Sequence, residues 1–285
     1  MSFRLGFHAS SAGTLEKTAD FVASMGGNAF QIFSSSPRMW HAPPPDRTQA
    51  LLLERARAKL DLFPLVIHAN YLINLCSADS GIRGKSIAAF RGEIERAIVI
   101  GAEYLVVHPG SSKDLAIEDA IKLGVAGLIE AAGDKSSTRL KILLENTAGQ
   151  GAAVGCKLEE LAALKQGSQA SVAIPIGYCL DTCHLFAAGF PIHLADGLAD
   201  TLAIVEQLLG LENVPVIHTN DSKPAFGSRV DRHDNIGKGQ IGLAAFERII
   251  NEPRLRDKAF ILETPSEDDG HIRDMAALRK LRIPD

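Results

Sequence analysis

We predict that this chain folds as a closed (β/α)8 TIM barrel, an α/β fold, in a single domain that spans residues 1–285. Three observations support the prediction. Short apolar runs recur eight times along the chain, and each ends in a polar residue and a turn. The segments between the runs have the pattern of helices, and eight strand-then-helix units close a barrel. No linker or shift in composition marks a boundary between two domains.

The eight runs are expected to be the barrel strands, because runs that are apolar on both faces are typical of parallel strands covered by helices. They span residues 4–8, 29–33, 64–68, 104–108, 141–145, 176–181, 214–218 and 259–263. An open doubly wound sheet is the alternative. We disfavour it because no Gly-x-Gly-x-x-Gly motif follows the first run.

Apolar residues at helical spacing mark two of the expected helices, residues 86–100 and 196–209. Each is followed by a glycine, Gly101 and Gly210 respectively, at a place where helices commonly end. The same pattern, less regular, fills the other gaps between the runs. The sequence therefore predicts a helix after each strand.

The composition indicates a globular protein with an ample core, since 46% of residues are hydrophobic and 22% are charged. No stretch has the ~18 uninterrupted apolar residues of a membrane span, and the first residues lack the apolar region of a signal peptide. We expect a cytoplasmic protein with no membrane partner. The four cysteines form no Cys-x-x-Cys pair, which argues against a thiolate zinc site and a disulfide framework.

The formal net charge of −4 would by itself argue against a nucleic-acid partner. Bound divalent cations would, however, make the protein more positive at the site where they bind. The overall charge therefore decides little about the partner. A monomer is expected, because no coiled-coil pattern or long exposed apolar stripe is visible.

Residues that can bind metal ions gather at the ends of the expected strands. Six runs end in such a residue, namely His68, His108, Glu145, Asp181, His218 and Glu263. His184 follows Asp181 by one helical turn. Asp231 and His233 lie two apart after the seventh run, so in extended backbone both side chains point to the same side. Catalytic groups of such barrels sit at the C-terminal ends of the strands, so we expect all nine residues to converge.

A metal centre is the simplest explanation of this set. Four carboxylates and five imidazoles in one pocket without cations would suffer severe desolvation and like-charge costs. At three or four ligands per ion the set suits two or three ions, and zinc, manganese and iron all remain open. Such clusters serve phosphoester hydrolysis, and ion pairs in barrels also serve sugar isomerisation. The strand ends alone leave both reactions open.

Five segments near these residues resemble signature motifs of the endonuclease IV family, the metal-dependent apurinic/apyrimidinic endonucleases of base-excision repair. They are His108-Pro-Gly-Ser111, Glu145-Asn-Thr-Ala-Gly-Gln-Gly151, Asp181-Thr-Cys-His184, His218-Thr-Asn-Asp-Ser-Lys223 and Gly227-Ser-Arg-Val-Asp-Arg-His-Asp-Asn-Ile-Gly237. The resemblance runs in order from Phe7-His8-Ala-Ser10 to Leu262-Glu-Thr264, so it covers nearly the whole chain.

The resemblance implies a cluster of three Zn²⁺ ions, with Mn²⁺ in place of one zinc in some cases. It assigns Glu145, His68 and His108 to one ion, and Glu145, Asp181, His218 and Glu263 to the second. It assigns His184, Asp231 and His233 to the third. Glu145 would bridge two ions and hold the attacking hydroxide. The implied reaction is hydrolysis of the phosphodiester 5′ to an abasic site, leaving a 3′-hydroxyl and a 5′-deoxyribose phosphate. Trimming of blocked 3′ ends is implied as well.

The implied partner is double-stranded DNA that contains abasic sites. The segments 35–40 and 70–75 resemble the loops with which the family enters DNA. Within them, Arg38 and Tyr71 are the residues we expect to fill the space left by a flipped nucleotide, since a planar cation and an aromatic ring both stack. Four basic residues are expected to contact phosphates. These are Lys223, Arg229, Arg232 and Lys238. His8 is expected to support the ligands or to contact a phosphate.

The chain departs from the family pattern in a few places. Thr14 stands where a second glycine is common, and the acidic run 267–269 matches no family motif. Two alternatives remain at this stage. A sugar isomerase or epimerase of the xylose-isomerase-like type would need no third ion and no DNA-entering loops. A non-catalytic binder of damaged DNA would be expected to have lost part of the ligand set.

Overall fold

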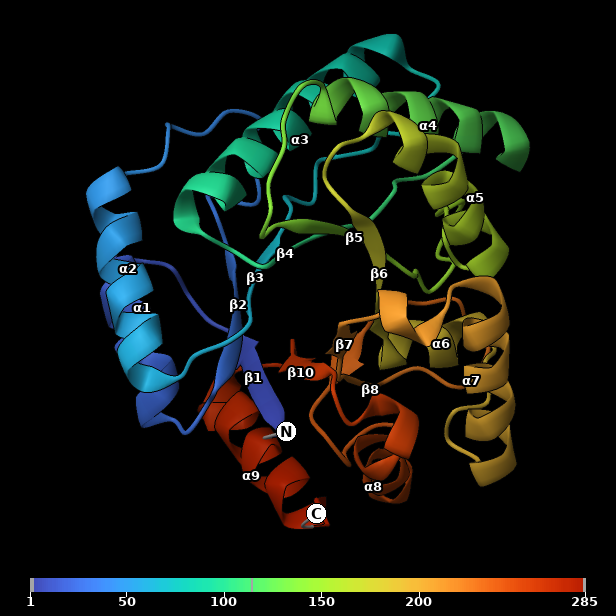
Figure 1. Cartoon of the computed structure of the whole chain (residues 1–285). Helices are drawn as coiled ribbons and strands as arrows, with labels where there is room; N and C mark the ends of the chain where they lie inside the picture. Colours follow the sequence, from blue (N-terminus) through green and yellow to red (C-terminus); the bar gives the residue numbers. More distant parts are fainter. Residues whose placement is uncertain (1–2, 114, 284–285) are drawn as a thin grey trace.

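The computed structural model describes residues 3–113 and 115–283, and its centre is a closed barrel of eight parallel strands (Figure 1). The strand order around the barrel is β1-β10-β7-β6-β5-β4-β3-β2. The predicted fold class is therefore confirmed. The predicted domain limits of 1–285 include residues 1, 2, 114, 284 and 285, which lie outside the described part of the chain.

The barrel strands coincide with the eight apolar runs. They are β1 (Arg4–His8), β2 (Ala29–Phe33), β3 (Leu65–His68), β4 (Tyr104–Val107), β5 (Lys141–Glu145), β6 (Ile176–Asp181), β7 (Val216–His218) and β10 (Ala259–Leu262). Two strands begin later than predicted because Pro64 and Pro215 have no N–H to donate to the sheet. Two more end one residue early, so that His108 and Glu263 directly follow β4 and β10.

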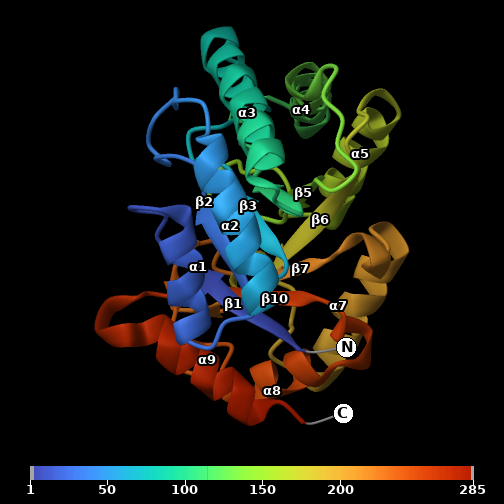
Figure 2. The ribbon, with the colours of Figure 1, turned by 60° about the vertical axis from the view of Figure 1, so that its left-hand side comes forward.

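Helices surround the barrel as a ring (Figure 1). They are α1 (Leu15–Ser24), α2 (Arg47–Leu60), α3 (Ser80–Ile100), α4 (Ile117–Ala132), α5 (Leu158–Ser168), α6 (Thr182–Ala188), α7 (Ala195–Leu208), α8 (Leu243–Asn251) and α9 (Gly270–Leu281). Figure 2 shows α1 and α2 side by side outside the first strands. None of the helices in the described part of the chain is long and apolar enough to cross a membrane.

The two helices predicted from their periodicity are present, with shifted starts. Helix α3 begins at Ser80 instead of residue 86, because Asp79 caps it: its Oδ1 accepts the N–H groups of Gly81 at 2.8 Å and Ile82 at 2.9 Å. The first turn has Ile82 as its one apolar residue and so carries no apolar pattern. Gly101 ends the helix in the left-handed conformation with φ 76°, as the sequence predicts.

The barrel interior has two layers, which follow from the alternation of side chains along a strand. The lower layer is apolar. Its buried members are Ala29, Val66, Val106, Leu143, Cys179, Val216, Ala259 and Ile261. Most of the residues that end the strands lie two positions further along and point the same way, which puts a polar layer directly above the apolar one. The larger apolar core lies between the barrel and the helices.

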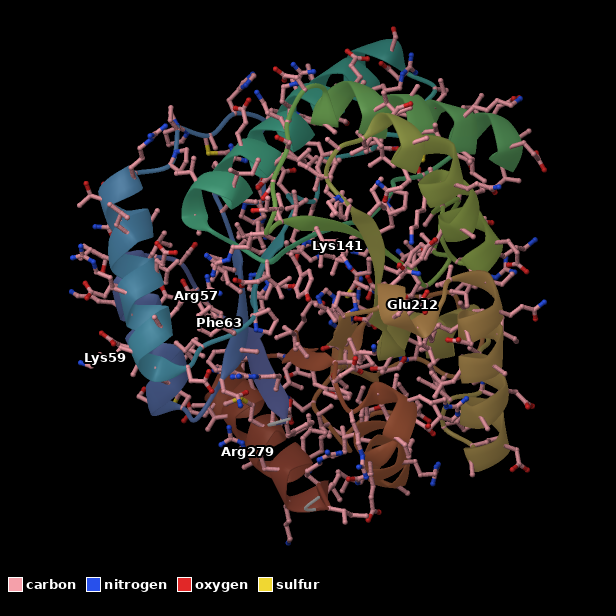
Figure 3. All side chains as sticks on the ribbon, viewed as in Figure 1. Arg57, Lys59, Phe63, Lys141, Glu212 and Arg279 are labelled. Carbon is pink, nitrogen blue, oxygen red and sulfur yellow. The ribbon has the colours of Figure 1, made fainter. Side chains whose placement is uncertain are left out.

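A buried arginine lies near the opposite end of the barrel, between α2 and the segments that precede β3 and β4. Arg57 of α2 is fully buried and pairs with Glu103. Its Nε donates to the carbonyl of Leu62 at 3.1 Å, and its guanidinium lies 4.6 Å from the ring centre of Phe63 (Figure 3). The charge is thus fully paired and bonded, as a buried cation requires. This end is structural, and the polar layer lies at the other end.

Candidate metal centre

The first of three adjoining groups of side chains brings β3, β4 and β5 together. Nε2 of His68 and Nε2 of His108 each lie 3.3 Å from Oε2 of Glu145. Glu145 and His68 are buried, and His108 is partly open. Two imidazole nitrogens and one carboxylate oxygen thus face a common point, a set that suits a divalent transition metal.

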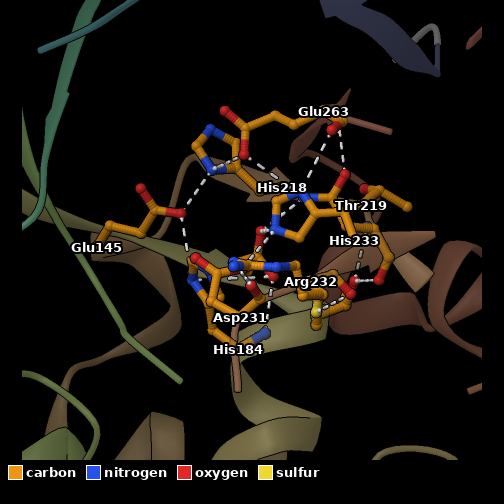
Figure 4. A network of polar contacts seen from close by, with 12 residues as sticks. Glu145, His184, His218, Thr219, Asp231, Arg232, His233 and Glu263 are labelled. Atoms are coloured by element: carbon orange, nitrogen blue, oxygen red, sulfur yellow. Dashed lines mark hydrogen bonds and ion pairs between the residues drawn. The ribbon is translucent and has the colours of Figure 1, made fainter. Parts of the chain in front are cut away.

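The second group uses the other oxygen of Glu145. Oε1 of Glu145 lies 2.7 Å from Nδ1 of His218, and that nitrogen lies 3.3 Å from Oε2 of Glu263 (Figure 4). Asp181, at the end of β6, completes the group. Because the two oxygens of Glu145 face different groups, its carboxylate has the arrangement of a bridge.

The third group lies toward the barrel mouth. Oδ2 of Asp231 is 3.1 Å from Nε2 of His184, and Oδ1 of Asp231 is 3.3 Å from Nε2 of His233. Nε2 of His233 also lies 3.6 Å from Oδ2 of Asp181, so this group adjoins the second. Figure 4 shows Glu145, His218, His184, Asp231 and His233 gathered around one space.

A buried carboxylate positions the loop that carries Asp231 and His233. Asp221 belongs to the short antiparallel pair β8 (Asp221–Ser222) and β9 (His233–Asp234), and it is fully buried. Its oxygens accept the backbone N–H groups of Gly237 at 2.9 Å, Gly239 at 3.1 Å and Ile241 at 2.9 Å. Gly237 has φ 78°, and at Gly239 a Cβ would come within 2.6 Å of the Asp221 carboxylate, so both glycines are required.

Three of the imidazoles are oriented by backbone carbonyls. Nδ1–H of His68 donates to Ala69 at 2.7 Å, Nδ1–H of His184 donates to Asn146 at 2.9 Å, and Nδ1–H of His233 donates to Glu263 at 3.2 Å. A neutral imidazole that donates through Nδ1 carries its lone pair on Nε2. In all three residues Nε2 is the nitrogen closest to a carboxylate, so the lone pairs point into the cluster.

The electrostatics fit a site for cations. Burial raises the pKa of Glu145, but the imidazoles of His218 and His108 lower it more, so that it lies well below its ordinary value. Burial lowers the pKa of His184, yet Asp181 and Asp231 raise it to about 10. Without a metal ion, protons would therefore take the place of cations on His184 and on His233, whose pKa is raised to about 9, whereas burial lowers the pKa of His108 to about 4.

Buried polar atoms that lack a hydrogen bond support the same conclusion. Oε2 of Glu145, Nε2 of His184 and Nε2 of His233 are buried and make no hydrogen bond with any residue in the described part of the chain. Buried polar atoms of native proteins are nearly always satisfied, by protein, water or a ligand. Each of these atoms belongs to one of the three groups, so the residues present fit divalent cations.

Comparison with known proteins agrees with this geometry. The family model described as a xylose isomerase-like TIM barrel matches residues 19–281. The probable endonuclease 4 of Solibacter usitatus is 53% identical, over 95% of this chain and 93% of that protein. The endonuclease 4 of Thermus thermophilus is 39% identical, over 96% of this chain and 97% of that protein. This chain belongs to the endonuclease IV family. A crystal structure of endonuclease IV from Thermus thermophilus superposes with a TM-score of 0.84, at 37% identity and 98% coverage of both chains.

Other barrels share the architecture of the endonuclease IV family. The crystal structure of a D-tagatose 3-epimerase-like protein superposes with a TM-score of 0.69, at 21% identity and over 97% of this chain and 96% of that one. At this identity the likeness concerns the fold alone. The predicted resemblance to endonuclease IV is thus confirmed, and the same barrel is also found in distant proteins named for sugar chemistry.

The residues predicted for DNA contact lie around the mouth of this endonuclease IV barrel. Tyr71 is 64% exposed, and its ring centre lies 5.2 Å from that of Phe33 and 5.7 Å from that of His68. It lines a cavity of about 640 Å³ that also reaches Asp231. Arg38 is exposed in the loop after β2, and Asn70 ties that loop to the loop of Tyr71 by donating to the carbonyl of Met39 at 2.9 Å.

The four predicted phosphate contacts are all exposed, on the segment from β8 past β9. They are Lys223, Arg229, Arg232 and Lys238. The side chain of Arg232 bonds within its own loop, since its Nη1 donates to the carbonyl of Asp231 at 2.7 Å. Arg229 has φ 55°, so the loop turns sharply at this residue. The segment thus presents four positive charges close to the third group.

Sequence reasoning did not single out three buried polar residues that touch the expected ligands. Asn220 donates to Oδ2 of Asp181 at 2.6 Å, and Asn146 accepts the backbone N–H of Asp181 at 2.7 Å. Gln31 of β2 donates to Oε1 of Glu263 at 2.6 Å. A signal for Gln31 was present, because it is a polar residue in an apolar strand, two positions after the inward-facing Ala29.

Proposed function

We propose that this chain is an endonuclease of base-excision repair that hydrolyses the phosphodiester 5′ to an abasic site in double-stranded DNA. It leaves a 3′-hydroxyl and a 5′-deoxyribose phosphate, and it also trims blocked 3′ ends. The observation that carries the proposal is the arrangement around Glu145, whose two oxygens face two different ligand groups in a member of the endonuclease IV family. The third group, with Asp231 and His233, adjoins them at the barrel mouth.

The groups would hold three divalent cations, which we propose to be Zn²⁺, with Mn²⁺ as an alternative at one position. The proposed donor sets are His68, His108 and Glu145; Glu145, Asp181, His218 and Glu263; and His184, Asp231 and His233. When bound, such a cluster ionises a water, neutralises the charge of the phosphate and stabilises the departing oxygen.

The residues of the protein are proposed to position the ligand groups and to exclude water from beneath the site. Glu145 is fully buried and lies between the first two groups, so it fixes their spacing and is the residue we propose to orient the attacking water. Asp231 is the most exposed of the nine side chains and lies closest to solvent, where a phosphate would enter. The apolar layer beneath the centre admits no water from below, which strengthens electrostatic interactions in the site.

DNA binding is proposed to use the two tied loops and the basic segment. Arg38 and Tyr71 are exposed side chains at the rim that could fill the space of an extruded nucleotide. Lys223, Arg229, Arg232 and Lys238 would contact phosphates. We further propose that the protein acts as a monomer in the cytoplasm, where its four free thiols would stay reduced. His8 is proposed to support the ligand residues, since its Nδ1 lies 3.8 Å from Oε1 of Glu263.

The decisive experiment is incision of a labelled duplex that carries one stable abasic analogue, with an undamaged duplex as control. A single cut 5′ to the lesion that leaves an extendable 3′-hydroxyl is the expected result. Absence of cutting by protein with its metals confirmed present would overturn the proposal. Tight lesion binding would then indicate a non-catalytic binder, and no binding would direct attention to sugar isomerisation.

A further inference from the structure

Gln31 occupies the place in the polar layer where a ligand would be expected from the strand pattern. It lies on β2 two residues after Ala29 of the apolar layer, in register with His8 of β1. Its side chain is fully buried. A buried amide is costly unless its hydrogen bonds are made, and the side chain of Gln31 has partners for its oxygen and for both of its N–H groups. All of these partners are expected ligands or His8.

The amide links two residues of the second ligand group. Oε1 of Gln31 lies 2.8 Å from Nε2 of His218, and Nε2 of Gln31 donates to Oε1 of Glu263 at 2.6 Å. Its other N–H points to Nδ1 of His8 at 2.9 Å. The amide orientation is fixed, because the reverse one would place its oxygen against a carboxylate oxygen that cannot donate.

This orientation determines which nitrogen of His218 carries the proton. Gln31 Oε1 can only accept, so Nε2 of His218 must donate, and the lone pair of the neutral ring lies on Nδ1. Nδ1 is the atom that faces Glu145 at 2.7 Å and Glu263 at 3.3 Å. His68, His184 and His233 have the opposite arrangement, with Nδ1 bonded to a backbone carbonyl. His218 therefore depends on a side chain for what these three receive from the backbone.

We propose that Gln31 is a positioning residue for the cation of the second ligand group, acting through His218 and Glu263. It selects the His218 tautomer with a free Nδ1, and it directs Glu263 so that Oε2 stays free to face the same point. The proposal rests on the metal centre of the proposed function. Gln31 itself is not a ligand, since its oxygen and both its N–H groups are committed to His218, Glu263 and His8.

The test is the affinity of the chain for Zn²⁺ in Gln31→Leu, which keeps the volume and removes the hydrogen bonds. Zinc per chain is measured by atomic emission after equilibration with a chromophoric chelator at graded concentrations. Loss of residues that orient metal ligands weakens metal binding by about 10- to 100-fold, so one of the three ions should be lost at correspondingly lower chelator concentration. Ile32→Val, a buried change on the same strand, is the matched control and should stay within about twofold of the parent chain.

A spectroscopic measurement distinguishes a role of Gln31 in positioning the ligands from a general loss of barrel stability. Loaded with Co²⁺, Gln31→Leu should change the visible ligand-field bands, while Ile32→Val should reproduce the parent spectrum. Gln31→Met, flexible and equally unable to donate through N–H, replaces the leucine variant if that one does not fold. Equal zinc affinity in the parent and a folded Gln31 variant, with unchanged Co²⁺ bands, would overturn this inference alone. A parent chain that binds no divalent cation would overturn the proposed function as well.

Discussion

Nδ1 of His218 and Oε1 of Glu145 lie 2.7 Å apart in the centre of the barrel, and both side chains are fully buried. The two residues come from strands that do not adjoin each other, β7 and β5, with β6 between them. The contact therefore spans the barrel interior rather than a neighbouring pair of strands. A carboxylate and an imidazole in this position either share a proton or share a cation.

Replacing Glu145 by glutamine is expected to abolish incision. The change removes the charge that two ligand groups share and replaces one acceptor oxygen by an N–H₂ group that cannot bind a cation. The loss in kcat/KM should be roughly 10³-fold or more, as for residues that act as part of a catalytic unit. Steady-state incision of an abasic duplex measures it. Full activity in Glu145→Gln would contradict the proposed mechanism.

Replacing Arg38 by alanine is expected to weaken lesion binding while leaving the metal content unchanged. Stacking of a side chain on a base contributes about 1–3 kcal/mol, so the Kd for an abasic duplex should rise by about 5- to 150-fold. Arg55→Ala, which removes the same charge from the exposed outer face of α2, is the control. An equal effect of both changes would show that Arg38 acts only through net charge.

Replacing Asp221 by asparagine is expected to release the loop of the third group. One oxygen of its carboxylate accepts the N–H groups of Gly237 and Gly239, and the other accepts that of Ile241. An amide keeps only one oxygen, so its N–H₂ would face one of these sets of donors without accepting. A buried group left unsatisfied costs about 1–3 kcal/mol. Thermal unfolding should show that loss, and metal analysis should show about one ion fewer per chain, because the anchored loop carries two of the three ligands of the third group. Unchanged metal content would show that Asp231 and His233 do not need this anchor.

The metal-free chain is expected to lose stability as the pH rises. Burial lowers the pKa of His233, but Asp181 and Asp231 raise it to about 9, and the pKa of His184 rises to about 10. An unfolded histidine titrates near 6.5, so this contribution is fully present below about pH 6.5 and is lost as the pH rises through about 9 to 10. Thermal unfolding of chelator-treated protein between about pH 6 and pH 10 measures the slope. Asp231→Asn should flatten it, and an identical slope in that variant would contradict the assignment.

The strands and the cluster of polar residues could be predicted because both depend on simple periodicity. Apart from the first run, which ends in His8, six apolar runs end in His, Asp or Glu, and alternation along a strand places those residues on the inward side. Two features had no such signal. The β8–β9 pair has two residues per strand, too few for a pattern, and the first turn of helix α3 has one apolar residue, so its only marker is the Asp79 cap.

Partners of the ligands were harder to predict than the ligands themselves. Asn220 and Asn146 lie just after β7 and β5, where polar residues of a loop are expected for many reasons. Their bonds to Asp181 depend on how neighbouring strands align, which one sequence does not specify. Gln31 is the residue that could have been found, since it follows Ala29 of the apolar layer by two positions, as His68 follows Val66 on β3.

The two layers inside the barrel have separate roles, since the apolar layer stabilises the fold and the polar layer holds the reactive side chains. Most strands contribute one apolar residue that keeps the barrel closed and, two residues later, one polar residue that faces the mouth. A designer could therefore exchange the upper set, strand by strand, to install other donor sets for other cations or for none. The residues of the apolar layer would stay unchanged, so the barrel would keep its fold while the ions that it binds, and the reactions that it supports, are altered.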